Sequence, residues 1–199
     1  MMLSRVVVYP FALIIAALVA WRALARGRPA PQALAGALLA LYVGWIISET
    51  FFPLPIRADV IHRLSAGQGF HNNIVPFRVI VQQVDSIMHP DSHHPAYEYV
   101  RQLAGNVLVF MPFSLLLPLA APSLGRLRRV LLAGFALSLT IELGQLAVSL
   151  VLGYSYRVAD IDDVILNVTG VLLGYGLVRL ASSAIRRFRY DAAVRHTSP

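Results

Sequence analysis

The 199-residue sequence contains no cysteine and no lysine, and only 14% of its residues are charged. Without cysteine, the chain forms neither disulfides nor thiolate metal sites. Soluble domains carry about 25% charged residues, so the low charge content argues against a soluble globular domain. The hydrophobic share of 57% points in the same direction. The composition therefore favours an integral membrane protein.

Five apolar stretches of the sequence are long enough to cross a bilayer as helices. About 30 Å of hydrocarbon requires roughly 20 predominantly apolar residues in a helix. No internal repeat or low-complexity segment divides the chain, so we expect residues 1–199 to form one domain. The predicted fold is an all-α integral membrane protein with a bundle of about five transmembrane helices. The expected spans are residues 6–24, 33–52, 103–121, 130–152 and 164–181.

All 17 basic residues are arginine, and nine of them form three clusters, after the first, third and fifth expected spans. With five spans these clusters lie on one side of the membrane, and the positive-inside rule makes that side cytoplasmic. Residues 182–199 then form a cytoplasmic basic tail, and the N-terminus lies outside. The net charge of +7 is thus a topology signal, and nucleic acid is not an expected partner. The clusters are Arg22, Arg26 and Arg28; Arg126, Arg128 and Arg129; and Arg186, Arg187 and Arg189.

The long segment between the second and third spans is predicted to be extracytoplasmic and to contain an amphipathic helix. From Phe77 onward, apolar positions fall on one helical face and polar positions on another. Pro76 suits the first turn of such a helix, and Asn72 or Asn73 is a candidate cap. The helix either lies in the outer interface or packs over the bundle, and these two interpretations are compatible. Its apolar face consists of Phe77, Ile80, Val84, Ile87 and Met88.

Polar side chains recur inside the expected spans, where an ionisable group costs roughly 2.5–3.5 kcal/mol on insertion scales. Glu142 lies near the middle of the fourth span, and Gln145 continues the same helical stripe. Glu49 and Asn106 lie near the outer ends of the second and third spans. Because these residues share the outer half of the membrane, we expect them to converge on one extracytoplasmic cavity.

The fifth span begins with acidic residues and carries one polar face toward its outer end. The two glycines of this face form a GxxxG pair, which lets another helix approach closely. The carboxylates and the asparagine of the face are expected to join the same cavity. The face consists of Asp160, Asp163, Asn167, Gly170 and Gly174.

Arg157 stands directly before these carboxylates, and its role has more than one interpretation. In the structural one, it pairs with Glu142, Asp160 or Asp163 and fastens the last two spans together, because an unpaired buried charge is costly. In the functional one, the cluster binds or transforms a polar head group presented at the outer leaflet. Conduction of an ion or proton through the carboxylates is a third interpretation.

A histidine-rich stretch supplies metal-ligand residue types, but its spacing matches no zinc signature. No nucleophile motif, phosphate-binding glycine loop or metalloprotease motif is present either. We therefore predict no metal site and no cofactor. The stretch contains His89, Asp91, His93 and His94.

Four blocks of the sequence, in this order and spacing, resemble the VanZ-like membrane proteins. They are NNIVPF, GNVLVFMPFSLLLP, IELGQL and RVADIDDVILNVTGVLLGY, and they delimit a core region at residues 72–175. Ser114 departs from the family pattern, which has glycine there. The polar and charged residues among the matching motif positions are taken as candidate binding residues. They are Asn73, Asn106, Glu142, Gln145, Arg157, Asp160, Asp163 and Asn167.

The resemblance implies a small multi-pass protein of the bacterial cell membrane with a contribution to teicoplanin-type antibiotic resistance. It supplies no catalytic residues. Two functional hypotheses stay open. The first is a protein that binds membrane lipids, a lipid-linked cell-wall precursor or a lipoglycopeptide at the outer leaflet. The second is a membrane enzyme that modifies a lipid or glycan head group through intramembrane carboxylates. The oligomeric state is open as well.

Overall fold

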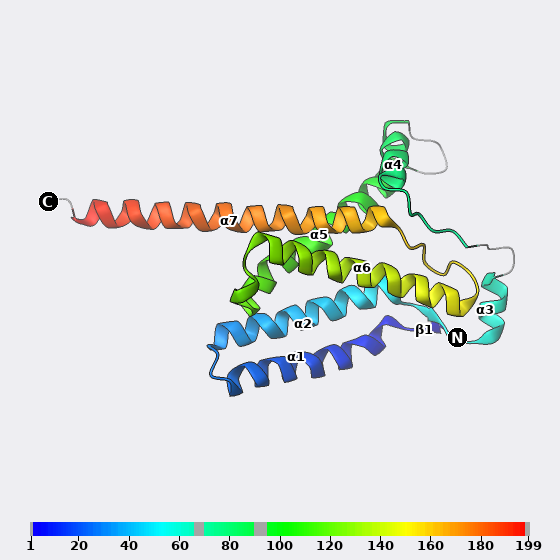
Figure 1. Cartoon of the computed structure of the whole chain (residues 1–199), viewed down its shortest axis with the longest axis horizontal. Coiled ribbons are helices and arrows are strands. Elements are labelled where there is room, and N and C mark those ends of the chain that lie inside the picture. The colour runs from blue at the N-terminus through cyan, green and yellow to red at the C-terminus, as the bar shows by residue number, and fades with distance from the viewer. Residues whose placement is uncertain (1, 66–69, 90–94, 198–199) are drawn as a thin grey trace.

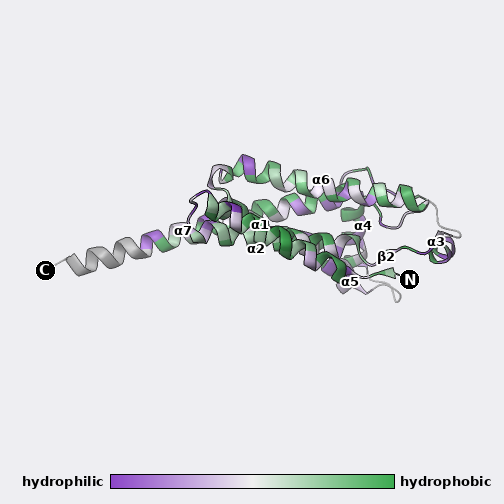
Figure 2. Cartoon of the chain, turned by 90° about the horizontal axis from the view of Figure 1, so that it is seen from below, coloured by the Kyte–Doolittle hydropathy of each residue, from purple (hydrophilic) through white to green (hydrophobic). Residues whose placement is uncertain are grey.

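Five long helices dominate the fold of the protein, which we describe from a computed structural model covering residues 2–65, 70–89 and 95–197. Each of the five is long and apolar enough to cross a membrane, so the chain is a multi-pass membrane protein, as the sequence predicts. They are α1 (Val8–Ala25), α2 (Ala30–Phe51), α5 (Ala96–Ala120), α6 (Leu127–Leu152) and α7 (Ile161–Thr197). Hydrophobic residues run along most of α1 and α2 (Figure 2).

Shorter elements lie between the long helices and before them. A two-residue ladder, absent from the predicted all-α fold, pairs β1 with β2 and connects the first residues to the segment after α2. These elements are β1 (Met2–Leu3), η1 (Arg5–Val7), β2 (Leu54–Pro55), α3 (Ala58–Ser65), α4 (Arg78–Met88) and η2 (Pro122–Leu124).

The two ends of the bundle differ in the segments that they carry. The α1–α2 and α5–α6 connections and the C-terminal part of α7 lie at one end, while α3 and the N-terminus lie at the other (Figure 1). The three arginine clusters belong to the first of these ends, in keeping with their predicted position on one side of the membrane. We call the opposite end, where α3 lies and near which α4 packs, the outer end.

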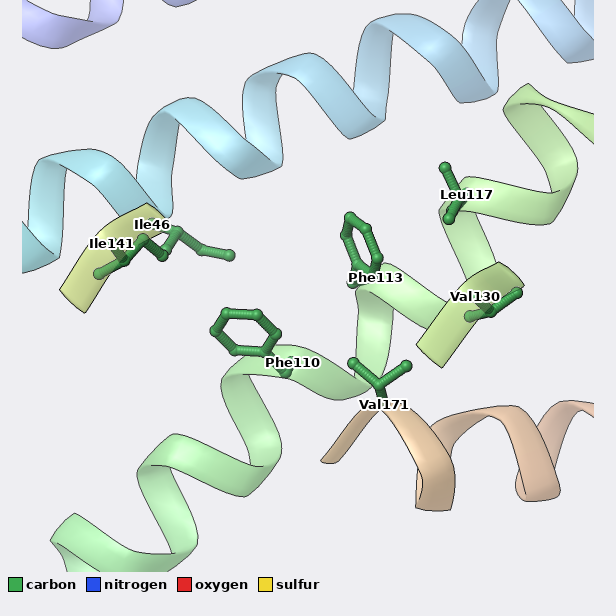
Figure 3. Close-up of a cluster of buried hydrophobic side chains, with 7 residues drawn as sticks. All are labelled: Ile46, Phe110, Phe113, Leu117, Val130, Ile141 and Val171. Carbon is green, nitrogen blue, oxygen red and sulfur yellow. The ribbon is translucent and has the colours of Figure 1, made fainter. Parts of the chain in front are cut away.

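A hydrophobic cluster in the middle of the bundle joins four of the long helices, α2, α5, α6 and α7. Phe110 and Phe113 of α5 lie at its centre, with Ile46 on one side and Val171 on the other (Figure 3). Because lipid tails are as apolar as these side chains, the cluster stabilises the bundle through close van der Waals packing rather than through removal from water. The cluster consists of Ile46, Phe110, Phe113, Leu117, Val130, Ile141 and Val171.

The GxxxG face of α7 packs directly on α5. A Cβ atom at Gly170 would collide with the backbone carbonyl of Val107, and one at Gly174 would collide with Ser114 and with the backbone of Met111. Only glycine lets the two helix backbones come this close. This contact sets the position of α7 along the length of α5.

The amphipathic helix α4 is shorter than a membrane span, and only part of its apolar face is covered by the rest of the protein. Ile80 and Ile87 are half-buried, whereas Phe77, Val84 and Met88 are exposed. Because α4 packs on α5 and also exposes apolar side chains, packing over the bundle and insertion into the outer interface are both still compatible with it. Pro76 precedes the helix, and neither Asn72 nor Asn73 caps it. The expected cap was therefore wrong.

We predict that Gly170→Ala destabilises the protein, since the added methyl group meets a backbone atom that cannot move alone. Overpacking of this kind costs about 1–3 kcal/mol, which lowers the apparent Tm by several degrees in a chain of this size. Thermal unfolding in detergent measures the effect. Gly176→Ala is the matched control, because a Cβ atom at this position on the same helix meets no other atom. An unchanged Tm for Gly170→Ala would contradict the described α5–α7 contact.

The arginine distribution predicts the orientation in the membrane, and cysteine labelling tests it on a chain without native cysteine. In intact cells, an impermeant maleimide should label Asp85→Cys on α4 and leave Ser123→Cys, between α5 and α6, unlabelled. Permeabilisation should make the second position reactive. Labelling of Ser123→Cys in intact cells would reverse the orientation.

Candidate functional site

Two segments far apart in the sequence lie side by side at the outer end and position the polar residues there. The backbone of Asn73 donates to Ala159 O at 3.0 Å and accepts from Ile161 N at 2.9 Å, which makes a parallel bridge to Asp160. His71 and Ser155 extend this contact through the Ser155 hydroxyl. The segment before α4 is thereby held against the segment before α7.

Asp160 and Glu142 connect these two segments with α6. Asp160 Oδ1 accepts from Asn73 Nδ2 at 2.7 Å and from the backbone N of Asp162 at 2.8 Å, so it caps α7. The backbone N of Asp160 donates to Glu142 Oε2 at 2.8 Å. Glu142 and Asp160 are both buried. Amide and backbone donors, rather than an arginine, therefore hold the carboxylates of these two residues.

Asp162, which the sequence analysis did not select, caps α4 from the first turn of α7. Its two carboxylate oxygens accept hydrogen bonds from the backbone N–H groups of Phe77, Val79 and Ile80. Its side chain is only 1% exposed. The sequence feature that could have indicated this role is the start of α4. Its N-cap position is Phe77, a residue with no side-chain acceptor. Such a helix start needs an acceptor from elsewhere.

A cavity of about 200 Å³ opens between α2, α5, α6 and α7 in the outer half of the bundle. Five of the eight candidate residues line it, namely Asn106, Glu142, Gln145, Asp163 and Asn167. We call it the outer cavity. Its other lining residues are Trp45, Ile46, Glu49, Thr50, Val109, Phe110 and Ile141. Ile46, Phe110 and Ile141 also belong to the central hydrophobic cluster, so apolar packing closes the inner side of the cavity.

Hydrogen bonds within the outer cavity engage some of its polar groups and leave others free. Asn106 Nδ2 donates to Asp163 Oδ1, and Asn167 Nδ2 donates to Ser138 Oγ at 2.9 Å. Gln145 is 8% exposed, and its Oε1 is buried without a hydrogen-bond partner in the described part of the chain. The cavity therefore combines the carboxylates of Glu142 and Asp163, in addition to that of Glu49, with an unsatisfied amide oxygen.

Glu49, the second carboxylate expected at membrane depth, is paired at the edge of the outer cavity. Arg5 Nη1 from η1 lies 2.7 Å from one oxygen of Glu49 and 2.8 Å from the other. The sequence analysis had treated Arg157 as the cation beside the carboxylates and had not considered Arg5. An exposed ion pair of this kind contributes about 0–1 kcal/mol, so it orients Glu49 more than it stabilises the fold.

The remaining candidates lie outside the outer cavity. Asn73 and Asp160 line a second cavity of about 200 Å³, which shares Glu142 with the first. Arg157 lines neither of the two. Glu142 therefore separates two cavities, one on each side of α6.

The expected ion pair between Arg157 and the carboxylates was wrong. Arg157 Nη2 donates to Phe52 O at 3.3 Å, its guanidinium lies 5.6 Å from the ring centre of Tyr156, and Nε has no partner among the described residues. Ion pairs within the described ranges join other residues. The backbone of Arg157, not its charge, contacts α6, since its N and O both bond to Ser149 Oγ.

The histidine-rich stretch lies mostly outside the described residues. His89 ends α4 and its Nδ1 lies 3.2 Å from Asp85 Oδ1. Asp91, His93 and His94 fall between residues 89 and 95, which the structure does not describe.

Comparison with known proteins gives a match to one family model, that of VanZ/LLP1, over residues 39–182. This range is most of the chain, contains the region 72–175 and includes every candidate binding residue named above. No curated protein and no solved structure matches the chain.

We predict that Asp162→Ala destabilises the outer end of the protein, because three backbone N–H groups of α4 lose their acceptor. Each buried group left unsatisfied costs about 1–3 kcal/mol. Thermal unfolding should show a lower Tm, and limited proteolysis should cut near α4. Asp85→Ala, which removes an exposed carboxylate from the same end, is the control. Equal Tm values for the two variants would rule out the capping role.

Proposed function

The chain belongs to the VanZ-like family, and from this premise we propose that its outer cavity binds the polar head group of a membrane lipid or lipid-linked cell-wall precursor. One observation carries the proposal. The outer cavity is lined by a buried Gln145, whose Oε1 has no partner in the described structure, together with Glu142 and Asp163. A buried polar atom without a partner costs free energy, and a bound head group would supply the missing donor.

The position of the outer cavity suits a ligand that arrives from the membrane. It lies between transmembrane helices in their outer half, and apolar side chains close its inner side. Its volume of about 200 Å³ is below the roughly 300–1,000 Å³ of pockets for drug-sized ligands. A compact head group fits this space, with its lipid tails beside the helices.

Head-group binding offers a route to the resistance that the family implies. A protein that holds a lipid-linked precursor at the outer leaflet alters the access of a lipoglycopeptide such as teicoplanin to its target. This route needs no chemical change of the precursor. We therefore propose that the chain contributes to teicoplanin-type resistance as a binding protein.

One observation also favours the enzymatic alternative. Glu142 lines the outer cavity with Asp163, and only one of its two carboxylate oxygens is hydrogen bonded within the described residues. A carboxylate with a free oxygen, close to a second carboxylate, is suited to acid–base chemistry on a bound head group. Turnover would appear as a lipid product of altered mass after incubation with the purified protein.

The test of the binding function is Glu142→Gln. The amide oxygen of glutamine still accepts from the backbone N of Asp160, so we expect a folded protein with nearly unchanged Tm. We expect it to lose the lipids that co-purify with the wild type, read by native mass spectrometry, and any protection against teicoplanin in a susceptibility assay.

Asp85→Asn serves as the control for this experiment, because it removes the charge of an exposed carboxylate outside the outer cavity. It should bind lipid as the wild type does. Full lipid retention and full protection in a well-folded Glu142→Gln protein would remove Glu142 from the site.

A further inference from the structure

Residues that line the outer cavity carry three hydrogen-bond acceptors without a partner among the described residues. Gln145 Oε1 has no partner in the described part of the chain, and the residue is more than nine-tenths buried. Glu142 uses Oε2 for the backbone of Asp160, and Asp163 uses Oδ1 for Asn106, so each carboxylate keeps one oxygen without a described hydrogen bond. The three residues that carry these acceptors line the same cavity.

The side-chain donors of the asparagines and arginines near these acceptors are already engaged. The side-chain amide of Asn106 donates to Asp163, and that of Asn167 donates to Ser138. Arg5 directs its guanidinium to Glu49, and Arg157 directs its own to Phe52 O. Among the described residues, no arginine therefore forms an ion pair with Glu142 or Asp163.

The charge of the cavity and its free acceptors both favour a ligand that is positively charged and donates hydrogen bonds. Two carboxylates in a membrane-spanning bundle are costly without a positive partner. An amide oxygen and two carboxylate oxygens around a small space match a group with several N–H donors and a positive charge. A phosphate has only acceptors and a negative charge, so these atoms would repel it.

We propose that the head group bound between Glu142, Gln145 and Asp163 carries a primary ammonium ion, an inference that rests on the function proposed above. The ammonium ion donates to Gln145 Oε1 and to the free oxygens of the two carboxylates. Its three N–H groups equal the three free acceptors in number. The rest of the head group extends toward the outer end.

Two sources supply a primary ammonium ion at the outer leaflet, an aminophospholipid and an amino sugar or peptide amine of a lipid-linked precursor. The first experiment uses the detergent-purified full chain and soluble probes. Ethanolamine and glucosamine represent the two sources, and N-acetylethanolamine and N-acetylglucosamine are their uncharged counterparts. We expect at least one amine to raise the Tm while its acetylated counterpart does not. Ethanolamine alone would indicate a phospholipid, and glucosamine alone an amino sugar.

The second experiment compares phosphatidylethanolamine with phosphatidylglycerol in native mass spectrometry of the same protein. We expect retention of phosphatidylethanolamine to be roughly tenfold or more stronger, as expected for a hydrogen-bonded charge. Glu142→Gln and Asp163→Asn, which keep the shape of each side chain, should each abolish this preference. Asp85→Asn should preserve it. Circular dichroism and gel filtration confirm that each variant is folded.

The outcomes separate this inference from the proposed function. If phosphatidylglycerol or the acetylated probes bind as well as their amine counterparts, and Glu142→Gln still weakens binding, the cavity binds head groups but the ammonium inference is overturned. If neither Glu142→Gln nor Asp163→Asn changes the binding of any lipid or probe, both the proposed binding function and the ammonium inference are overturned. An amine preference that survives both substitutions would also overturn the assignment to these residues.

Discussion

The carboxylate of Asp162 accepts three backbone hydrogen bonds from the start of α4, and the outer end of the protein is arranged around this contact. It joins the first turn of α7 to a helix that has no cap of its own. Two residues earlier, Asp160 caps α7 itself and bonds to Asn73 and Glu142. Asp160 and Asp162, at the start of α7, therefore serve as helix caps. Helix N-termini favour negative charge because their N–H groups are unpaired.

This arrangement explains how so many carboxylates are tolerated at the edge of a membrane bundle. Asp160 and Asp162 are satisfied by backbone and amide donors, and each is buried. Glu142 and Asp163 are only partly satisfied, and both line the outer cavity. The structure thus divides one acidic cluster into residues that hold helices and residues that face an open space. The unsatisfied pair is the part suited to a ligand.

Much of the fold could be predicted from the sequence, because span length and glycine spacing follow from general constraints. The five spans and the close approach of another helix at Gly170 are of this kind. Helical periodicity also placed Asn106, Glu142 and Asp163 around one cavity. It could not show that amide and backbone donors would satisfy Asp160, which lies by a second cavity, and would leave Arg157 outside the cluster. The donors to Asp160 Oδ1 are the side-chain amide of Asn73 and the backbone N of Asp162 in the first turn of α7, and the periodicity of a single span reports neither.

Arg5 and Asp162 were missed for a related reason, since each acts on a segment distant in sequence. Arg5 reaches Glu49 from a short 3₁₀ turn before the first span, and Asp162 lies off the polar face that the spacing of α7 defines. Nothing within their own segments indicates these partners. The sequence did contain an indirect sign in α4, an amphipathic helix whose start lacks a capping side chain.

The order of residues along the chain has a consequence for biogenesis. The acceptors for the start of α4 and the donor for Glu142 come from residues 160–162, which a ribosome makes only after α4, α5 and α6. Until those residues arrive, Glu142 is an intramembrane carboxylate without the backbone donor of Asp160, and α4 lacks its cap. Insertion of the last helix therefore completes the outer end as a single event. A chain that stalls before α7 presents these exposed polar groups to the membrane quality-control machinery.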